Sequence, residues 1–184
     1  KKTGYAQTMN NNIMRWTVSG VRNDSTTSLQ SFYWRDTLPT DAVRLTRLVT
    51  GTYSTTQTYK VTFTTNLNSQ WRTAYDNLST AKNYTLDMSS AALGLASNEY
   101  VTQFMLSFGI VPAGFHQLTN ATVDAQTLYA LTNGYKFTNK ADVGGLLGGN
   151  WVQSIARWTT SIYSHYVPAK PAAPKSPTLP RTGY

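Results

Sequence analysis

The alternation of apolar and polar residues in short stretches constrains the fold of this chain more than any other feature. In Thr58–Thr65, the apolar residues Tyr59, Val61 and Phe63 occupy every second position. Successive side chains of a β-strand point to opposite faces, so this period is that of a strand with one buried face. Further strand candidates are Ile13–Val21, Phe32–Leu38, Tyr100–Gly109, Gly134–Gly144 and Trp151–Tyr163. The last of these segments also fits helical spacing.

Two short helices are expected to interrupt the strands. In Ser69–Lys82, Trp71, Tyr75 and Leu78 recur at i, i+4 and i+7, and Met88–Ala96 is short and rich in alanine. Several short strands separated by turn residues favour two packed sheets. We therefore predict an all-β, Ig-like β-sandwich with short helical insertions.

The composition supports the all-β class and limits the kinds of catalytic or metal site that the chain can form. Threonine and serine make up about a quarter of the 184 residues and aromatic residues 12%, and threonine and aromatic residues suit strands. The absence of cysteine excludes disulfides, thiolate zinc sites and cysteine nucleophiles. The chain has only two histidines and one glutamate, so it contains few of the side chains that a multi-histidine metal centre or a carboxylate-pair hydrolase needs. We expect no metal, no cofactor and no enzyme, and the low charged fraction is typical of a secreted or cell-surface protein.

A proline-rich tail defines the domain boundary. Prolines stand at every third position from Pro168 to Pro180, which matches the three residues per turn of a polyproline II helix. We predict a sandwich domain over 1–166 and an extended, semi-rigid spacer over 167–184.

The tail ends in a recognisable motif. Leu179, Pro180, Arg181, Thr182 and Gly183 resemble the Leu-Pro-any-Thr-Gly sorting signal of Gram-positive surface proteins at every fixed position. The resemblance implies that a sortase cuts between the threonine and the glycine and joins the threonine to an amine. That amine would belong to peptidoglycan or to another pilin subunit. The apolar span and basic tail that follow in such signals are missing here, so we expect a chain trimmed after the motif.

The body of the chain resembles domains of Gram-positive Firmicutes surface proteins that carry intramolecular isopeptide bonds, of the collagen-adhesin-like and fimbrial types. The resemblance covers most of 1–145 and is most specific in Asp36-Thr37-Leu38-Pro39, which follows an aromatic strand. The other matching pieces are 32–35, 59–66, 99–102, 108–109 and 137–143. It implies a collagen-adhesin-A-like sandwich.

The same resemblance implies three site residues. Lys2 would bond to Asn139 with Asp36 as the catalytic acid, and Lys1 is the fallback for the lysine. Strand alternation places Asp36 and Asn139 among apolar residues on faces expected to be buried. Burial without a partner is unfavourable for polar groups, and it favours a protonated carboxyl and a neutral amine. The alternative is that Asp36 caps a turn and Asn139 bonds a sheet edge.

Weaker signals leave other functions open or unsupported. Trp16, Trp71, Trp151 and Trp158 could form a sugar-binding platform or could belong to the core. The glycine-rich stretch 144–149 lacks the lysine of a phosphate loop and indicates a flexible turn. The +8 net charge is scattered, which does not favour nucleic-acid binding.

The sequence thus predicts an extracellular, cell-wall-anchored stalk module of an adhesin or a pilus subunit. The alternative is a ligand-binding adhesin domain that recognises host matrix or a glycan.

Overall fold

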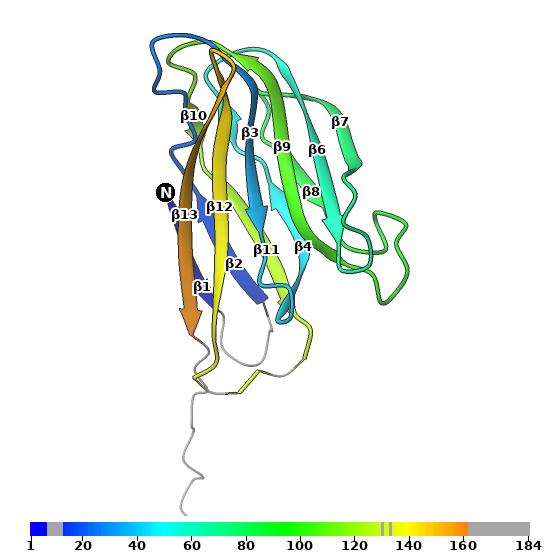
Figure 1. The fold of residues 1–184 in the computed structure, drawn as a ribbon. Helices are drawn as coiled ribbons and strands as arrows, with labels where there is room; N and C mark the ends of the chain where they lie inside the picture. The colour runs from blue at the N-terminus through cyan, green and yellow to red at the C-terminus, as the bar shows by residue number, and fades with distance from the viewer. Residues whose placement is uncertain (7–12, 130, 133, 162–184) are drawn as a thin grey trace, which may run out of the picture.

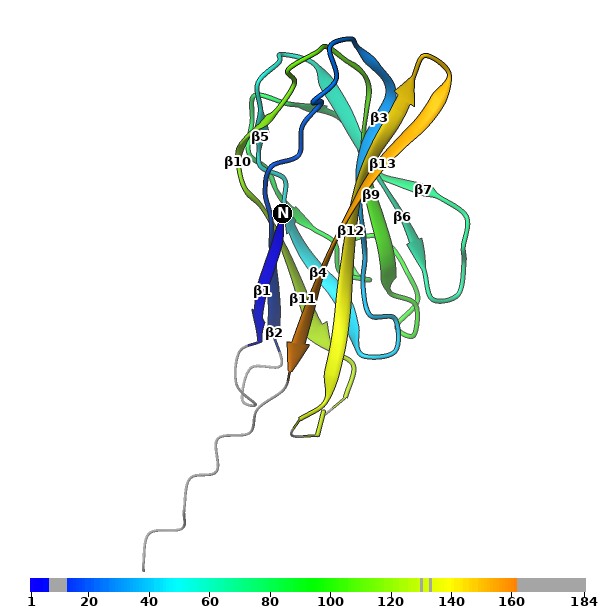
Figure 2. The ribbon, with the colours of Figure 1, turned by 60° about the vertical axis from the view of Figure 1, so that its left-hand side comes forward.

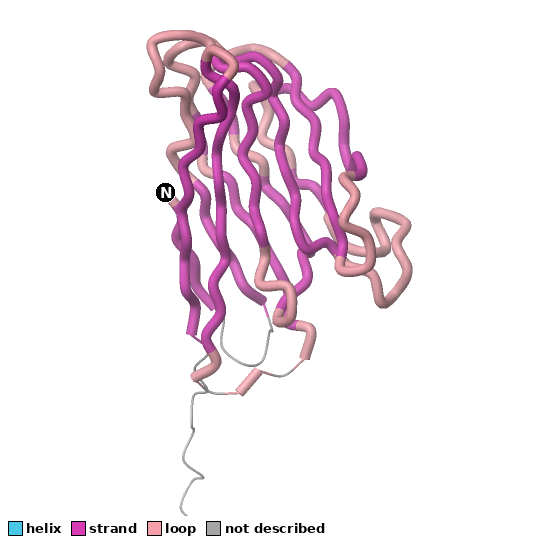
Figure 3. Tube along the Cα trace, in the orientation of Figure 1, coloured by secondary structure: helices cyan, strands magenta, loops and turns pink. Residues whose placement is uncertain are grey.

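The computed structural model describes residues 1–6, 13–129, 131–132 and 134–161, and their regular structure is entirely β-strand (Figure 3). Two antiparallel sheets pack face to face (Figures 1 and 2). The all-β, Ig-like sandwich predicted from the sequence is therefore confirmed. The described part of the chain contains no helix that could cross a membrane.

The smaller main sheet has five strands and includes the N-terminal strand at one edge. In spatial order its strands are β1 (Lys2–Ala6), β2 (Ile13–Val18), β11 (Ala121–Thr127), β4 (Val43–Val49) and β8 (Thr85–Asp87). β1, at the edge of this sheet, lies beside the last strand of the opposite sheet, β13 (Asn150–Ser161) (Figure 2).

The larger sheet has six strands, and the last strand of the described chain forms one of its edges. In spatial order its strands are β13 (Asn150–Ser161), β12 (Lys136–Leu147), β3 (Leu29–Thr37), β9 (Val101–Val111), β6 (Thr58–Thr65) and β7 (Arg72–Ser79). A small two-stranded sheet, β5 (Thr52–Tyr53) and β10 (Gln117–Thr119), accompanies them.

The core lies between the two main sheets and is rich in aromatic rings. Phe32, Trp34, Asp36 and Leu38, predicted to share one face, are each at most 2% exposed. The Trp34 indole N–H donates a hydrogen bond of 2.8 Å to the hydroxyl of Tyr53. The β3 face that carries these residues is therefore a buried face, as the alternation predicts.

The predicted helix at Ser69–Lys82 is wrong, because this segment forms edge strand β7. Its pairing with β6 shifts register twice, and Asn77 has a φ of 55°. Such an irregularity breaks the two-residue period of a strand. Tyr75 and Leu78 consequently both pack against the core although they are three positions apart, which imitates a helical spacing.

The predicted helix at Met88–Ala96 is also wrong, because the segment makes only turns. The Leu93 amide donates to the Ser89 carbonyl at 3.1 Å, as in a single helical turn. Gly94 then takes a φ of 66°, which is incompatible with a right-handed helix. The alanines therefore do not continue into a helix.

The glycine-rich stretch is only partly a turn. Gly144 and Gly145 lie inside β12, whereas Gly148 and Gly149, with φ values of 54° and 85°, form the tight turn between β12 and β13. Two central residues with positive φ suit a two-residue hairpin. Of the ambiguous segment Trp151–Tyr163, the described part is a strand.

Candidate functional site

Lys2 and Asp36 meet in the interior between the two sheets. Lys2 comes from β1 of the five-stranded sheet and Asp36 from β3 of the six-stranded sheet. Both side chains are completely buried, and the Lys2 ammonium contacts a carboxylate oxygen, Oδ2, of Asp36. Lys1, the fallback lysine, is exposed. The structure therefore brings Lys2 rather than Lys1 to the aspartate.

Asn139 completes the predicted set of three residues. In the β3–β12 pair, Ala141 lies opposite Asp36, so Asn139 is the diagonal neighbour on the same face. Asn139 is 0% exposed and lies close enough to Asp36 to lower the pKa of that carboxyl. Nevertheless, neither amide atom of Asn139 has a hydrogen-bond partner of ordinary geometry among the described residues, and neither does the second carboxyl oxygen, Oδ1, of Asp36.

The surroundings raise the pKa of Asp36 above its usual value. Burial is the largest cause, and the charge of Asp142 adds to it. The charge and hydrogen bond of Lys2, together with Asn139, act in the opposite direction without cancelling the effect of burial. A carboxyl in this setting favours its protonated form, which can donate a hydrogen bond.

Aromatic rings close the site. The Lys2 Nζ atom lies 5.8 Å from the centroid of the Trp16 ring, and Phe137 meets the same ring edge-on at 6.2 Å. Gly4, two residues after Lys2, leaves room for this ring: a Cβ at Gly4 would lie 2.3 Å from Trp16 Cδ1. Aromatic side chains therefore pack closely around the Lys2 amine.

These three groups have the chemistry of an amide-forming site. An amine, once neutral, is a nucleophile; a side-chain amide offers an electrophilic carbon; and a protonated carboxyl can polarise the amide and shuttle a proton. In the described residues, no cluster of three or more metal-ligating side chains offers a competing metal site.

The predicted sorting motif, the spacer and the four tryptophans lie away from the Lys2 site or outside the described residues, except for Trp16. Leu179, Pro180, Arg181, Thr182 and Gly183, with the whole spacer and the 166/167 boundary, lie outside the described residues. Trp16 is part of the core, whereas Trp71, Trp151 and Trp158 are 39%, 65% and 36% exposed. The four tryptophans therefore do not form one platform.

The sequence did not predict three carboxylate clusters, two on the outer faces of the sheets and one at a loop. Asp124 accepts hydrogen bonds from Arg15 and Arg47, and Asp142 accepts them from Arg35. These partners stand on neighbouring strands, so only the strand register reveals them. Alternation alone marks such residues as outward-facing, with no indication of a partner.

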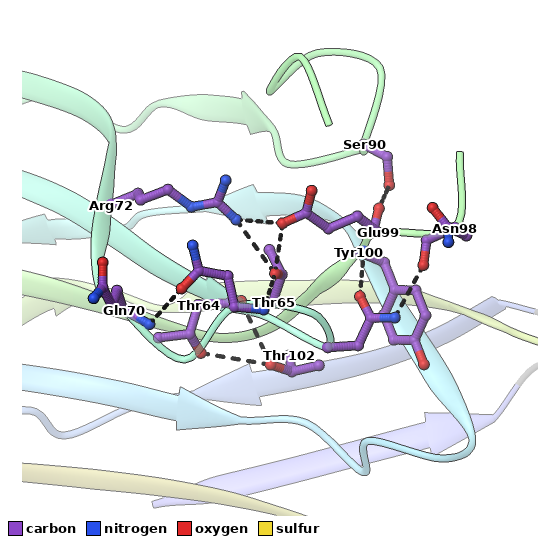
Figure 4. Close-up of polar contacts among 11 residues, drawn as sticks. Thr64, Thr65, Gln70, Arg72, Ser90, Asn98, Glu99, Tyr100 and Thr102 are labelled. Carbon is purple, nitrogen blue, oxygen red and sulfur yellow. Dashed lines mark hydrogen bonds and ion pairs between the residues drawn. The ribbon is translucent and has the colours of Figure 1, made fainter. Parts of the chain in front are cut away.

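The third cluster surrounds Glu99, the one glutamate in the chain (Figure 4). The Thr65 hydroxyl donates to its carboxylate at 2.7 Å and the Arg72 guanidinium at 2.5 Å. These bonds hold the pKa of Glu99 below its usual value. Ser90 donates to the Glu99 backbone carbonyl at 2.5 Å and so links two parts of the 88–100 loop. The bonds from Thr65 of β6 and Arg72 of β7 tie that loop to the larger sheet. The cluster therefore acts as a structural clamp.

Comparisons with known proteins give fold likenesses alone. No family model matches the chain, and no curated protein matches it. A collagen-binding domain from a Staphylococcus aureus adhesin aligns over 87% of this chain and 95% of its own, with 12% identity and a TM-score of 0.40. The collagen-binding subdomain of the Enterococcus faecalis surface protein ACE aligns over 89% and 95%, with 14% identity and a TM-score of 0.40. The C-terminal domain of the Streptococcus agalactiae AgI/II polypeptide BspA aligns over 84% of this chain and 44% of its own, with 12% identity and a TM-score of 0.37. With such low TM-scores and sequence identities, these likenesses do not transfer a function to this chain.

Proposed function

We propose that this chain is a structural module of a Gram-positive cell-surface protein, in which an amide bond between Lys2 and Asn139 joins the two sheets. The observation that carries the proposal is the fully buried Lys2–Asp36 contact beside Asn139, whose amide atoms have no hydrogen-bond partner among the described residues. Such a bond would let the module bear load as a stalk of an adhesin or a pilus subunit.

The reaction balances within these three residues. The neutral Lys2 amine attacks the side-chain carbonyl carbon, Cγ, of Asn139, and a bond forms between Nζ and Cγ. The bond from Cγ to Nδ2 breaks. Asp36 takes one proton from Nζ and passes it to Nδ2, which leaves as ammonia. Burial raises the pKa of Asp36, so its carboxyl favours the protonated form that can pass a proton to the leaving group.

An ordinary buried ion pair explains the arrangement less well. Removing two charges from water is unfavourable unless further hydrogen bonds satisfy their remaining atoms. Within the described part of the chain, Asp36 Oδ1 and both amide atoms of Asn139 lack such bonds. Conversion of the amine and amide into one uncharged amide removes the buried charge and one of the polar groups without a partner.

Intact mass spectrometry of the denatured chain tests the bond. We expect a mass lower than calculated by one ammonia, and a peptide in which Lys2 is joined to Asn139. Asp36→Ala removes the proton carrier and should restore the full mass. Asp124→Ala, at another largely buried carboxylate, is the matched control and should keep the low mass. A full calculated mass for the unsubstituted chain would overturn the proposal.

The proposal extends to anchoring through Leu179–Gly183. Its support is the sorting motif after the proline-rich spacer, with sortase as the enzyme and peptidoglycan or a pilin subunit as the acceptor. A purified sortase with triglycine should release Gly183-Tyr184 from the chain. Thr182→Ala should abolish release, and Thr178→Ala, at the residue just before the motif, should not. Release from the Thr182→Ala chain at the same bond would contradict this reading.

A further inference from the structure

A hollow of about 730 Å³ lies on the outer face of the six-stranded sheet, away from the Lys2 site. It is lined from both edges, by Trp151 of β13 and by Trp71 next to β7. Five spacings of about 4.8 Å separate these edge strands, so the hollow crosses roughly 24 Å of sheet. This extent suits an elongated ligand better than a single small ring.

The floor of the hollow is low because small residues occupy its middle. Ser107 of β9 lies opposite Tyr33 on one side and Lys60 on the other, and Gly109 follows on the same strand. The larger side chains of β3, β6 and β13 rise around these small residues. The sheet therefore forms a trough rather than a flat face.

The Tyr33 ring at one end of the trough is held in a fixed position. Its hydroxyl donates to Asp142 at 3.0 Å and accepts from Gln153 at 3.2 Å. Arg35 binds the same carboxylate and lies 5.6 Å from the ring centroid. A Cβ at Gly144 would come within 3.1 Å of the ring, so glycine lets it pack closely on the sheet. A ring ordered without ligand loses little entropy on binding.

Two tryptophans are exposed beside this ordered ring. Trp151 is 65% exposed and meets Tyr33 edge-on, with centroids 6.4 Å apart, while Trp71 is 39% exposed. Exposed tryptophan is unfavourable in water and is enriched where a protein binds a partner. The trough thus offers aromatic surface at both ends.

Polar groups of both signs lie between the aromatic rings. Lys60 and Asp76 line the trough together with Arg35, whose charge is already balanced by Asp142. Among the described residues, Lys60 makes no ion pair. The site therefore presents donors and acceptors with little net charge, unlike a basic nucleic-acid surface.

The backbone is unusual at the same place. Ser31, with a φ of 49°, lines the trough, and Asn77, with a φ of 55°, follows Asp76. These are the two residues other than glycine with positive φ in the described parts of the chain. Register shifts in β3 and in the β6–β7 pair accompany them. Strained backbone and bulges concentrate at functional sites, where they redirect side chains.

We propose that this trough binds a linear oligosaccharide of several sugar rings. The apolar faces of the sugars would stack on Trp151, Tyr33 and Trp71, and their hydroxyls would bond to Lys60, Asp76 and Ser107. An apolar drug-like ligand would need a more enclosed, less polar pocket. The proposal does not depend on the Lys2–Asn139 bond.

An array of defined host and bacterial oligosaccharides, followed by titration calorimetry with the best binder, tests the proposal. The unsubstituted chain should bind at least one glycan of three or more sugars. Trp151→Ala and Trp71→Ala should each weaken that binding about tenfold or more, as expected for an aromatic anchor. Trp158→Ala, on the same strand as Trp151 but outside the trough, is the matched control and should bind normally.

Three results would overturn the proposal: no glycan bound, binding that Trp151→Ala and Trp71→Ala leave unchanged, or binding of a triple-helical collagen peptide in place of glycans. Asp36→Ala should retain glycan binding, provided that it folds. This variant separates failure of the trough proposal from failure of the isopeptide proposal.

Discussion

At the scale of single residues, the buried carboxylates of this protein fall into two kinds. Asp124 and Asp142 are largely buried, yet arginines from neighbouring strands satisfy them. Asp36 is completely buried, faces a lysine and leaves one oxygen without a hydrogen-bond partner among the described residues. Buried polar groups in folded proteins are nearly always paired. Asp36 therefore differs from the two arginine-paired aspartates, as the reactive role that we propose for it requires.

Asp124 gives a prediction about acid stability. Burial pushes its pKa upward, but hydrogen bonds from Arg15 and Arg47 outweigh burial and hold the pKa below its usual value. Its stabilising contribution is therefore present above the unfolded pKa of about 3.9 and is lost as the pH falls through the lower folded pKa. Asp124→Asn should reduce the free energy of unfolding at pH 7 by about 1 kcal/mol.

Urea unfolding at pH 7 and at about pH 3 measures this effect. The difference between Asp124→Asn and the unsubstituted chain should shrink at the lower pH. Asp24→Asn, in an exposed pair with Arg22, is the control and should change stability little at either pH. A difference that grows on acidification would contradict the assigned pKa direction.

At the scale of elements, regular strands were predictable and irregular ones were not. Alternation located the buried face of β3 and the inward position of Asn139 on β12, because both segments keep a two-residue period there. Edge strand β7 breaks that period at Asn77, and its apolar residues then resemble one face of a helix. A bulge depends on the pairing partner, so a single strand's sequence does not reveal it.

Asn77 provides a test of this interpretation. Asparagine tolerates positive φ and glycine adopts it freely, whereas a β-branched residue is strained there. Asn77→Gly should change the free energy of unfolding by only a few tenths of a kcal/mol, and Asn77→Val should lower it by about 1–2 kcal/mol. A helix would give the reverse order, because glycine is unfavourable inside helices.

Chemical denaturation of both variants decides between these orders. Thr73→Val, at an exposed position of β7 opposite Thr62, serves as a control and should be neutral or slightly stabilising. Loss of stability in Asn77→Gly that exceeds the loss in Asn77→Val would be inconsistent with the bulged strand.

At the scale of the whole molecule, the sequence predicted the β-sandwich fold and the three residues that lie together between the sheets. Their convergence followed from a family resemblance together with inward-facing positions. The trough on the opposite face of the six-stranded sheet was not predictable. It draws Trp151, Tyr33, Lys60 and Trp71 from four separate segments, and only the order of strands across the sheet brings these together.

The final prediction concerns the bond as a constraint on the whole domain. Lys2 and Asn139 are far apart in the sequence, so their bond would close a ring of more than a hundred residues. By analogy with disulfide rings of that size, closure should stabilise the fold by about 4–5 kcal/mol. For a domain of this length, that corresponds to roughly 8–20 °C in melting temperature. Reductants should have no effect, because the chain contains no cysteine.

A double-mutant cycle isolates the contribution of the Lys2–Asn139 bond to the free energy of unfolding. Lys2→Met and Asn139→Ala each remove the bond, and each should lower the free energy of unfolding by about 4–5 kcal/mol. The double variant should lose little more than either single variant, because the bond is lost only once. Thermal and urea unfolding of the four chains, each checked by intact mass, gives the result. Two independent, additive losses would mean that the residues contribute separate contacts and that no covalent tie spans the sandwich.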